Sequence, residues 1–320
     1  MSTPSGTSVT GEPSGPPPSV SAIVATYNSE ATGGVAECLG SLRAQKYPGR
    51  LEILVVDGGS TDGTLRIAEE AADKVLTNPR RTELGFGGGK DLGLQHASGE
   101  LVAMVDADNR LMEPEYIDRM ARPLAASERV VLTVPNPWIP PRGAEPSICR
   151  YFCLRESDLW HRWAEGGETR EGWVEFRPPV GVVPNAGLLR RESLLQLGGW
   201  DFDTEVGQRL LGDRAAVFAW VETAHRFHRE VLGYADLWRK MDRRMRTQVE
   251  EGTVKPAVQE EIQSLRRDPI AFLRTELAQP IAAAIRRSEP AYLHAVPVFL
   301  VTGMLFLARG LWRAPGGSAG

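Results

Sequence analysis

Short runs of apolar residues, separated by stretches with helical spacing, constrain this fold more than any other sequence feature. The runs occupy residues 20–25, 51–56, 74–77, 101–105 and 130–134. The stretches between them with apolar residues at helical spacing are 35–45, 64–72, 90–97 and 115–124. Buried strands that alternate with helices are typical of a parallel sheet covered on both faces. Right-handed crossovers then predict an open α/β sandwich.

Composition excludes several other classes of protein. The chain has 320 residues, of which 42% are hydrophobic and 24% charged, as in an ordinary globular protein. The formal net charge of −4 argues against a chain-wide electrostatic surface for nucleic acid, so we expect no nucleic-acid partner. Three cysteines are too few for a disulfide framework and predict buried thiols in a reducing compartment, the cytoplasm.

The chain divides into three parts by composition. Residues 1–19 are rich in Ser, Thr, Gly and Pro, and this composition predicts a disordered tail. Residues 20–230 form the α/β domain, with one half over 20–135 and a second half over 136–230. Residues 231–320 predict a helical C-terminal region.

The second half and the C-terminal region give weaker local signals. Residues 136–180 have little periodicity. After them the sequence predicts a strand at Val180–Val183, a helix over 191–197 closed by Gly198 and Gly199, and a basic helix from about Tyr234 to Arg246.

The apolar segment from Ala291 to Leu307 allows three interpretations. It is a little shorter than the ~20 residues of a spanning helix, and arginines flank it on both sides. It therefore predicts a helix lying in the membrane interface, a single membrane span, or a packed core helix.

Polar residues follow the predicted strands at their carboxyl ends, where open α/β sheets bind ligands. Asn28, Asp57, Asp106 and Asp108 all occupy such positions. Side chains two residues apart in an extended segment point the same way, so Asp106 and Asp108 project together. A divalent cation would relieve the repulsion between the two carboxylates, and Mg²⁺ or Mn²⁺ suits such a pair beside a diphosphate. The alternative is that one aspartate caps the next helix and the other faces water.

Two glycine-rich segments add candidates for phosphate and nucleotide contacts. In 57–64, the glycines allow a sharp turn that points Asp57 into the cleft, while Ser60, Thr61 or Asp62 caps the next helix. In 85–91, the pattern fails as a P-loop because Asp91 follows the lysine where Ser or Thr is needed. We expect a flexible turn there, with Lys90 either meeting a diphosphate or simply solvated.

The last candidate segment is 198–210, where Asp203 and Glu205 stand near the start of a predicted helix. Acidic residues in a first helical turn compensate the helix dipole. A catalytic base at a cleft is also acidic, and the sequence alone does not separate the two roles.

Taken together, these segments resemble the family 2 glycosyltransferases. The resemblance covers residues 20 to about 230 and rests on Thr26-Tyr-Asn-Ser29, Val55-Val-Asp57-Gly-Gly-Ser-Thr-Asp-Gly-Thr64, Ala97-Ser-Gly-Glu100, Asp106-Ala-Asp108, Leu189-Arg-Arg191 and Leu197-Gly-Gly-Trp200. It implies a GT-A fold, with an open, mostly parallel sheet sandwiched by helices. It also implies an inverting, metal-dependent enzyme that uses a nucleotide-diphosphate sugar.

The resemblance assigns roles to individual residues. It implies that Asp57 binds the nucleotide, and we expect Thr26, Asn28, Lys90 and Asp106 to contact it as well. It implies that Asp106 and Asp108 hold the metal and the diphosphate, and that a late histidine, His225 or His228, completes the metal shell. We take His228 as the third ligand; a core or surface histidine is the alternative.

The same resemblance makes Asp203 the general base. The sequence departs from the family here, because Phe202 replaces the usual glutamate and the spacer after Gly199 is short. Asp201 and Glu205 are therefore alternative bases. Residues 208–212 lack the signature of processive members, which favours transfer of a single sugar.

The expected function is transfer of one sugar from a nucleotide-diphosphate donor, a UDP-sugar by family habit, to an acceptor hydroxyl. Expected partners are a saccharide or lipid-linked acceptor of the cell envelope or of an exopolysaccharide, and a membrane surface. We expect a cytoplasmic location, with the C-terminal region attached to the inner face of the membrane. The alternatives are a nucleotidyltransferase-like enzyme and a catalytically inactive protein that binds sugar nucleotides.

Overall fold

The computed structural model describes residues 15–78, 81–179, 181–200, 203–229, 231–250, 267–268, 270 and 274–308. Residues 1–14, most of the predicted tail, lie outside the described residues. Contacts divide the chain into a first unit, residues 1–136 with 160–226, and a second unit, residues 137–159 with 227–320. The division falls inside two strands, β6 and β10, and one helix, α5, each of which continues through it.

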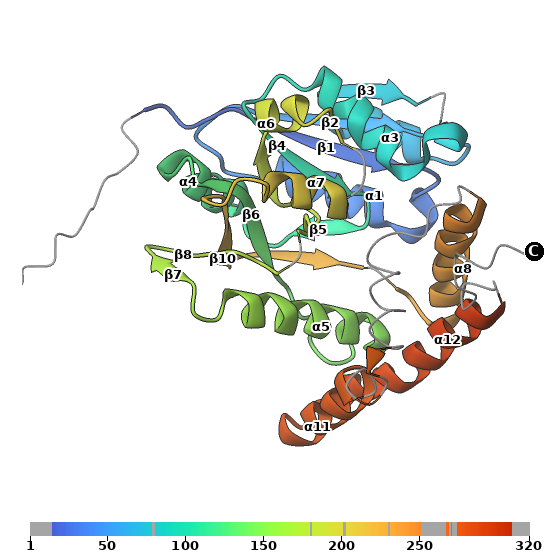
Figure 1. The fold of residues 1–320 in the computed structure, drawn as a ribbon. Helices are drawn as coiled ribbons and strands as arrows, with labels where there is room; N and C mark the ends of the chain where they lie inside the picture. The colour runs from blue at the N-terminus through green and yellow to red at the C-terminus, as the bar shows by residue number, and fades with distance from the viewer. Residues whose placement is uncertain are drawn as a thin grey trace, which may run out of the picture. The chain divides into compact units, whose positions relative to one another are not determined.

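One sheet organises the first unit (Figure 1). Its strands are β1 Val20–Thr26, β2 Leu51–Asp57, β3 Lys74–Thr77, β4 Leu101–Asp106, β5 Asn109–Leu111, β6 Val130–Pro137, β7 Glu168–Arg170, β8 Trp173–Phe176, β9 Leu188–Arg190 and β10 Val217–His228. Their order is β3-β2-β1-β4-β9-β6-β10-β8-β7, and β5 pairs with β10. β3, β2, β1 and β4 are parallel, whereas β9 runs antiparallel to β4 and β6. The predicted parallel sheet is confirmed in its first half.

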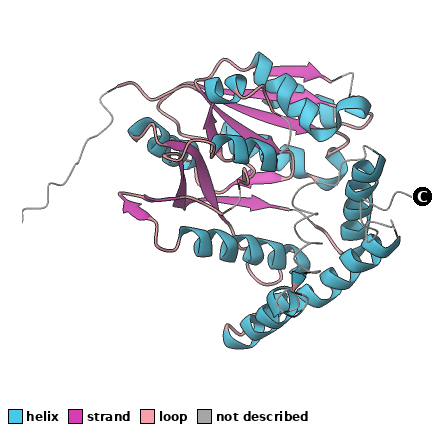
Figure 2. Ribbon diagram, in the orientation of Figure 1, coloured by secondary structure: helices cyan, strands magenta, loops and turns pink. Residues whose placement is uncertain are grey.

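Helices connect these strands and continue to the end of the described chain (Figure 2). They are η1 Glu30–Thr32, α1 Gly34–Arg43, α2 Thr64–Ala71, α3 Arg81–His96, α4 Tyr116–Ala126, α5 Ser147–Ala164, α6 Arg191–Gln196, α7 Asp203–Leu210, α8 Tyr234–Glu250, η2 Arg274–Ala278, α11 Gln279–Arg286, η3 Pro290–His294 and α12 Ala295–Ala308.

Alternation along the central strands places core residues on both faces of the sheet. On β4, Ala103 and Val105 belong to one apolar cluster, which includes residues of α1 and α4. Val102 and Met104 belong to the opposite cluster, which includes residues of α3, α6 and α7. A strand covered on both sides must be apolar at nearly every position, which explains the continuous apolar runs in the sequence.

Two local predictions are wrong. The segment 85–91 is not a turn but part of α3. Gly93, which follows this segment in α3, shows why the helix contains glycine. A Cβ at this position would lie 2.3 Å from Ile23 Cγ2 on β1. The glycine lets the helix approach the sheet closely. The strand predicted at 180–183 is absent from its described residues, Gly181–Val183, and the regular structure begins only at β9.

The second unit has its own small core and a largely buried ion pair. The core includes Leu154 of α5, Leu237 of α8 and Val298 of α12. Beside it, the Glu289 carboxylate lies 2.6 Å from Arg150 Nη2. Hydrogen bonds from Arg150 lower the pKa of Glu289 to about 2. Among the described residues, no helix combines the length and the apolar character needed to cross a membrane.

Candidate active site

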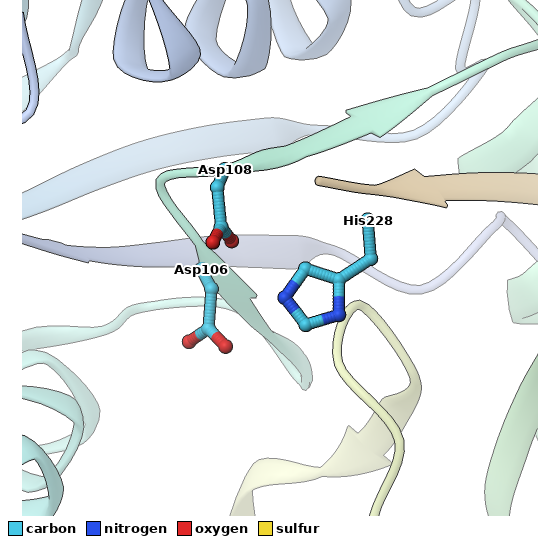
Figure 3. A group of neighbouring side chains, drawn as sticks. All are labelled: Asp106, Asp108 and His228. Atoms are coloured by element: carbon cyan, nitrogen blue, oxygen red, sulfur yellow. The ribbon is translucent and has the colours of Figure 1, made fainter. Parts of the chain in front are cut away.

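Two carboxylates and an imidazole meet where β4 ends. Asp106 is the last residue of β4, Asp108 lies in the turn before β5, and His228 is the last residue of β10. One ligand atom from each of the three side chains lies within 4.8 Å of the other two. Figure 3 shows the His228 ring beside both carboxylates. Because all three side chains are only partly buried, a ligand can reach them.

The turn that carries Asp108 differs from the extended segment assumed in the sequence analysis. Ala107 and Asp108 are turn residues between two strands, yet the two carboxylates still face one another. The start of α1 supports this turn, because a Cβ at Gly34 would lie 3.0 Å from the Ala107 carbonyl oxygen. Glycine at the start of α1 therefore allows the helix to approach the turn.

A buried thiol lies beneath the same turn. Burial, with smaller contributions from the charges of Asp108 and Asp106, raises the pKa of the Cys38 thiol above its usual range. The protonated Sγ donates to the Asp106 carbonyl oxygen at 3.6 Å. All three cysteines of the chain are buried thiols, as predicted.

Lys90 supplies positive charge at this site. Its Nζ lies 3.1 Å from Asp106 Oδ1, and its side chain is only 8% exposed. The prediction of a merely solvated lysine is therefore wrong. The ammonium also lies 5.5 Å from the centre of the Trp200 ring, a cation–π distance. Two carboxylates and one lysine leave a net negative charge, so the donor set of oxygen and nitrogen atoms fits a divalent cation.

Asp91 connects α3 to the loop before α7. Its Oδ1 accepts the Trp200 backbone N–H at 2.9 Å. Gly199 has φ +95°, and a Cβ there would lie 2.3 Å from Asp91 Oδ1. Glycine is thus required both for the backbone conformation and for the close approach of the carboxylate. Neither contact was predicted from the sequence, because a partly buried aspartate and a loop 109 residues away share no local pattern.

Asp57 lies at the end of β2 and is held by its own turn. Its Oδ2 accepts the Gly59 and Ser60 N–H groups, each at 2.8 Å, and its Oδ1 accepts the Ser60 hydroxyl at 2.5 Å. A carboxylate has about four lone-pair directions, so one acceptor position on Oδ1 is left for a ligand donor. The N-cap of α2 is Gly63, so the prediction that Ser60, Thr61 or Asp62 caps this helix is wrong. Asp62 Oδ1 still accepts the N–H of Thr64, the first residue of α2, at 3.0 Å.

Asn28 links the end of β1 to the same turn. It adopts a left-handed conformation with φ +46°, which asparagine tolerates better than most residues. Its N–H donates to the Ser60 hydroxyl at 2.9 Å, and its Oδ1 accepts the Thr61 N–H at 2.8 Å. Thr26, two residues earlier, donates to the Ser29 hydroxyl at 2.9 Å. Thr26, Asn28 and Asp57 therefore lie together at the ends of two adjacent strands.

The structure does not choose among Asp203, Asp201 and Glu205 as the general base. Asp203 is the first residue of α7, as expected for a residue near a helix start. Its side chain and that of Glu205 lie outside the described side chains, and Asp201 and Phe202 lie outside the described residues. His225 is held elsewhere, because its Nδ1 lies 2.5 Å from Glu113 Oε1. The structure therefore brings His228, and not His225, to the two aspartates.

Comparison with known proteins assigns the family. The family model described as glycosyl transferase family 2 matches residues 21–197, more than half of the chain. The chain belongs to glycosyl transferase family 2. It is therefore a glycosyltransferase, and its mixed, mostly parallel sheet with flanking helices is the GT-A fold.

Curated relatives of this glycosyltransferase are similar over part of their length. The putative glycosyltransferase EpsH of Bacillus subtilis is 37% identical over 107 residues, which covers 33% of this chain and 30% of EpsH. An N-acetylglucosaminyltransferase of Mesorhizobium japonicum is 36% identical over 190 residues, which covers 58% of this chain and 42% of that protein. The chain thus spans less than half the length of these relatives.

A solved structure is similar to this chain in fold over nearly its whole length. The mannosyltransferase PcManGT from Pyrobaculum calidifontis, in complex with GDP-Man and Mn²⁺, aligns with a TM-score of 0.55. The alignment covers 94% of this chain and 88% of PcManGT at 22% sequence identity. At that identity the likeness concerns the fold.

Proposed function

We propose that this glycosyltransferase transfers one sugar, with inversion, from a nucleotide-diphosphate donor to an acceptor hydroxyl. We favour a UDP-sugar as donor and a saccharide or lipid-linked acceptor of the cell envelope or of an exopolysaccharide. The observation that carries the proposal is the meeting of Asp106, Asp108 and His228 at the end of β4 in a family 2 chain.

The three side chains would hold Mg²⁺ or Mn²⁺. When bound, such a cation neutralises the charge that develops on the leaving diphosphate. Lys90, beside Asp106, adds a positive charge at the same place. Mn²⁺ in the PcManGT complex supports a divalent cation, and makes Mn²⁺ the first to test.

The ends of β1 and β2 would bind the nucleotide. Asp57 keeps one acceptor position on Oδ1, which suits an N–H donor of a base such as uracil. Asn28 holds the loop that carries Ser60, and Thr26 lies at the end of the neighbouring strand. The turn is thus shaped before any ligand arrives, which lowers the entropy cost of binding.

Asp203 would deprotonate the acceptor hydroxyl as it attacks the anomeric carbon. A positioned base contributes on the order of 10²–10⁴ in rate. Asp203→Asn is therefore expected to lower turnover by about that factor while leaving affinity for the nucleoside diphosphate unchanged. Asp201→Asn and Glu205→Gln are the matched controls. Near-normal turnover of Asp203→Asn, with a large loss in either control, would assign the base to that other residue.

A donor screen of the purified chain tests the function as a whole. Released nucleoside diphosphate is measured for a panel of UDP- and GDP-sugars, with Mg²⁺, with Mn²⁺ and with chelator. UDP-N-acetylglucosamine and GDP-mannose come first, because an N-acetylglucosaminyltransferase and a structure with GDP-Man are among the similar proteins. We expect metal-dependent release from one donor class. Binding of a donor without hydrolysis or transfer, under every condition, would instead support an inactive sugar-nucleotide-binding protein.

We also propose that the reaction takes place in the cytoplasm. The three buried thiols support a reducing compartment, where such thiols persist. The family match favours sugar transfer over the nucleotidyl transfer considered from the sequence.

A further inference from the structure

Exposed apolar side chains are concentrated in the second unit. Among the described residues, ten large apolar side chains are exposed, and nine of them lie between Leu232 and Leu300. The tenth is Tyr27 in the first unit. Scattered single exposures are normal on a protein surface, whereas a concentration of them marks an interaction surface.

Four helical segments of this unit carry apolar residues on two sides. On α11, Ala284 faces the small core, while Ile281 and Ile285 are exposed, the latter to 75%. Ile281 and Ile285 are four residues apart and therefore lie on one side of the helix. A helix that is apolar on its inner and outer sides is typical of a fully buried helix or of one in contact with lipid.

The same arrangement recurs on η3, α12 and α8. Ala291, Ala295 and Val298 face the core, whereas Leu293, Val296 and Leu300 are exposed at spacings of three and four residues. On α8, Leu237 is buried in the core and Trp238 is exposed. These segments adjoin, because α8 packs on α12 and α11 packs on η3. We call the exposed set the outer apolar residues: Trp238, Ile281, Ile285, Leu293, Val296 and Leu300.

The charges around the outer apolar residues are mainly positive. Glu289 is the one acidic residue in the sequence from 279 to 302, and its buried carboxylate is bound by Arg150. Arg286, at the end of α11, is exposed. In the sequence of α8, residues 234–250, five residues are basic and three are acidic. The Arg239 side chain is 73% exposed, and its Nη2 lies 3.7 Å from Asp236 Oδ1.

We propose that the outer apolar residues insert into the interface of a lipid bilayer that carries anionic headgroups. Apolar side chains on one side of surface helices, with arginine and lysine close by, are the features of helices that lie in such an interface. Trp238 adds an amphipathic ring, which is favoured at the level of the headgroups. This proposal does not depend on the proposed sugar transfer.

A second copy of the chain is the competing occupant. In a contact between two identical copies, the same basic residues would approach one another, and like charges placed across an interface repel. Arg239, Lys240 and Arg286 therefore favour anionic lipid over a second copy.

Vesicle flotation of the full chain tests the proposal. Vesicles of phosphatidylcholine alone are compared with vesicles that also contain phosphatidylglycerol, at low and at high salt. We expect binding to the anionic vesicles that weakens with salt, as screening of the basic residues requires. Ile285→Glu with Leu300→Glu should lower the bound fraction about ten-fold or more, because both apolar contacts are lost.

Two further variants make the result specific. Ala125→Glu with Ala126→Glu adds the same charge at exposed positions of α4 in the first unit and should bind vesicles like the unaltered chain. Ile285→Ser with Leu300→Ser removes the apolar groups without adding charge and should also lose binding. Circular dichroism and donor hydrolysis check that each variant is folded.

Three results would overturn the proposal. The first is that the unaltered chain floats with neither kind of vesicle, and the second is that the serine variant floats as well as the unaltered chain. The third is a dimer in sedimentation velocity that the serine variant converts to a monomer, without vesicle binding, which would assign these residues to a subunit interface. Because flotation needs no catalysis, failure of the donor screen leaves this test intact.

Discussion

Acidic side chains lie at the ends of two parallel strands of the sheet, β2 and β4, and their surroundings differ. At the end of β2, Asp57 is 2% exposed and accepts three hydrogen bonds from its own turn. At the end of β4, Asp106 and Asp108 face each other and His228, and the Asp106 side chain is 35% exposed. The first carboxylate is stabilised by hydrogen bonds from its own turn, whereas the proposed function gives the second pair a divalent cation. The order of the strands brings these carboxylates to the carboxyl ends of the parallel strands, where ligands bind. The hydrogen bonds around each carboxylate then determine what it can bind.

The largest expected effect follows from removing one carboxylate of the pair. Asp108→Asn should lower turnover by on the order of 10³-fold, because the electrostatic stabilisation of the leaving group is lost. It should also abolish the difference in UDP affinity between Mn²⁺ and chelator, as measured by titration calorimetry. If Mn²⁺ still raised the UDP affinity of this variant as it does that of the unaltered chain, the metal would not be bound at the end of β4.

The Glu289 carboxylate in the second unit differs from both, because it forms ion pairs with Arg142 and Arg150. Glu289→Gln should lower the free energy of unfolding by about 2 kcal/mol at neutral pH, the range for a hydrogen bond to a charged group. Its pKa is lowered from 4.5 to about 2, so this stability is present above pH 4.5 and is lost as the pH falls towards 2.

Urea unfolding at a series of pH values measures this difference. The matched control is Glu70→Gln, whose carboxylate pairs with Arg66 at the surface, where both side chains are 63% exposed. Such a pair contributes little, and the control should change stability by less than about 1 kcal/mol. Equal effects of the two substitutions would show that Glu289 is not stabilised by its arginines.

Asp57→Asn tests the hydrogen-bonded carboxylate at the end of β2. Loss of the charge weakens the turn and removes an acceptor, so UDP affinity should fall about ten-fold. The fall should be the same with Mn²⁺ and with chelator, because Asp57 is satisfied without a cation. A loss confined to the Mn²⁺ condition would mean that the end of β2 also takes part in metal binding.

The smallest expected effect concerns the loop before α7. Asp91→Ala removes the acceptor of the Trp200 N–H and should lower kcat about five-fold, the value of one hydrogen bond, because α7 begins three residues later at Asp203. The Mn²⁺ dependence of UDP binding should be unchanged. Asp91→Asn keeps an oxygen acceptor and should restore most of kcat, whereas a purely structural defect would lower thermal stability in both variants.

The sequence predicts the first half of this fold well. The apolar runs of β1, β2 and β4 are recognisable because each of these strands is buried on both faces. β3 is a partly exposed strand at the edge of the sheet. The pair Asp106 and Asp108 is recognisable because it directly follows such a run.

The second half and several contacts of the site were not predictable in this way. α5 lies in a segment where Trp and charged residues obscure the periodicity, and β9 has only three residues. The pairing of Lys90 with Asp106 depends on glycines that bring α3 close to the sheet, although the same glycines suggested a turn. Such features arise from tertiary packing, which overrides local preference.

The central claim is that Asp106 and Asp108 jointly hold a divalent cation. Anomalous X-ray scattering from crystals soaked with Mn²⁺ and UDP tests it most directly. The account predicts a single strong anomalous peak between these two carboxylates and the His228 ring, absent from Asp108→Asn crystals. A peak elsewhere, or no peak in crystals that contain bound UDP, would contradict it.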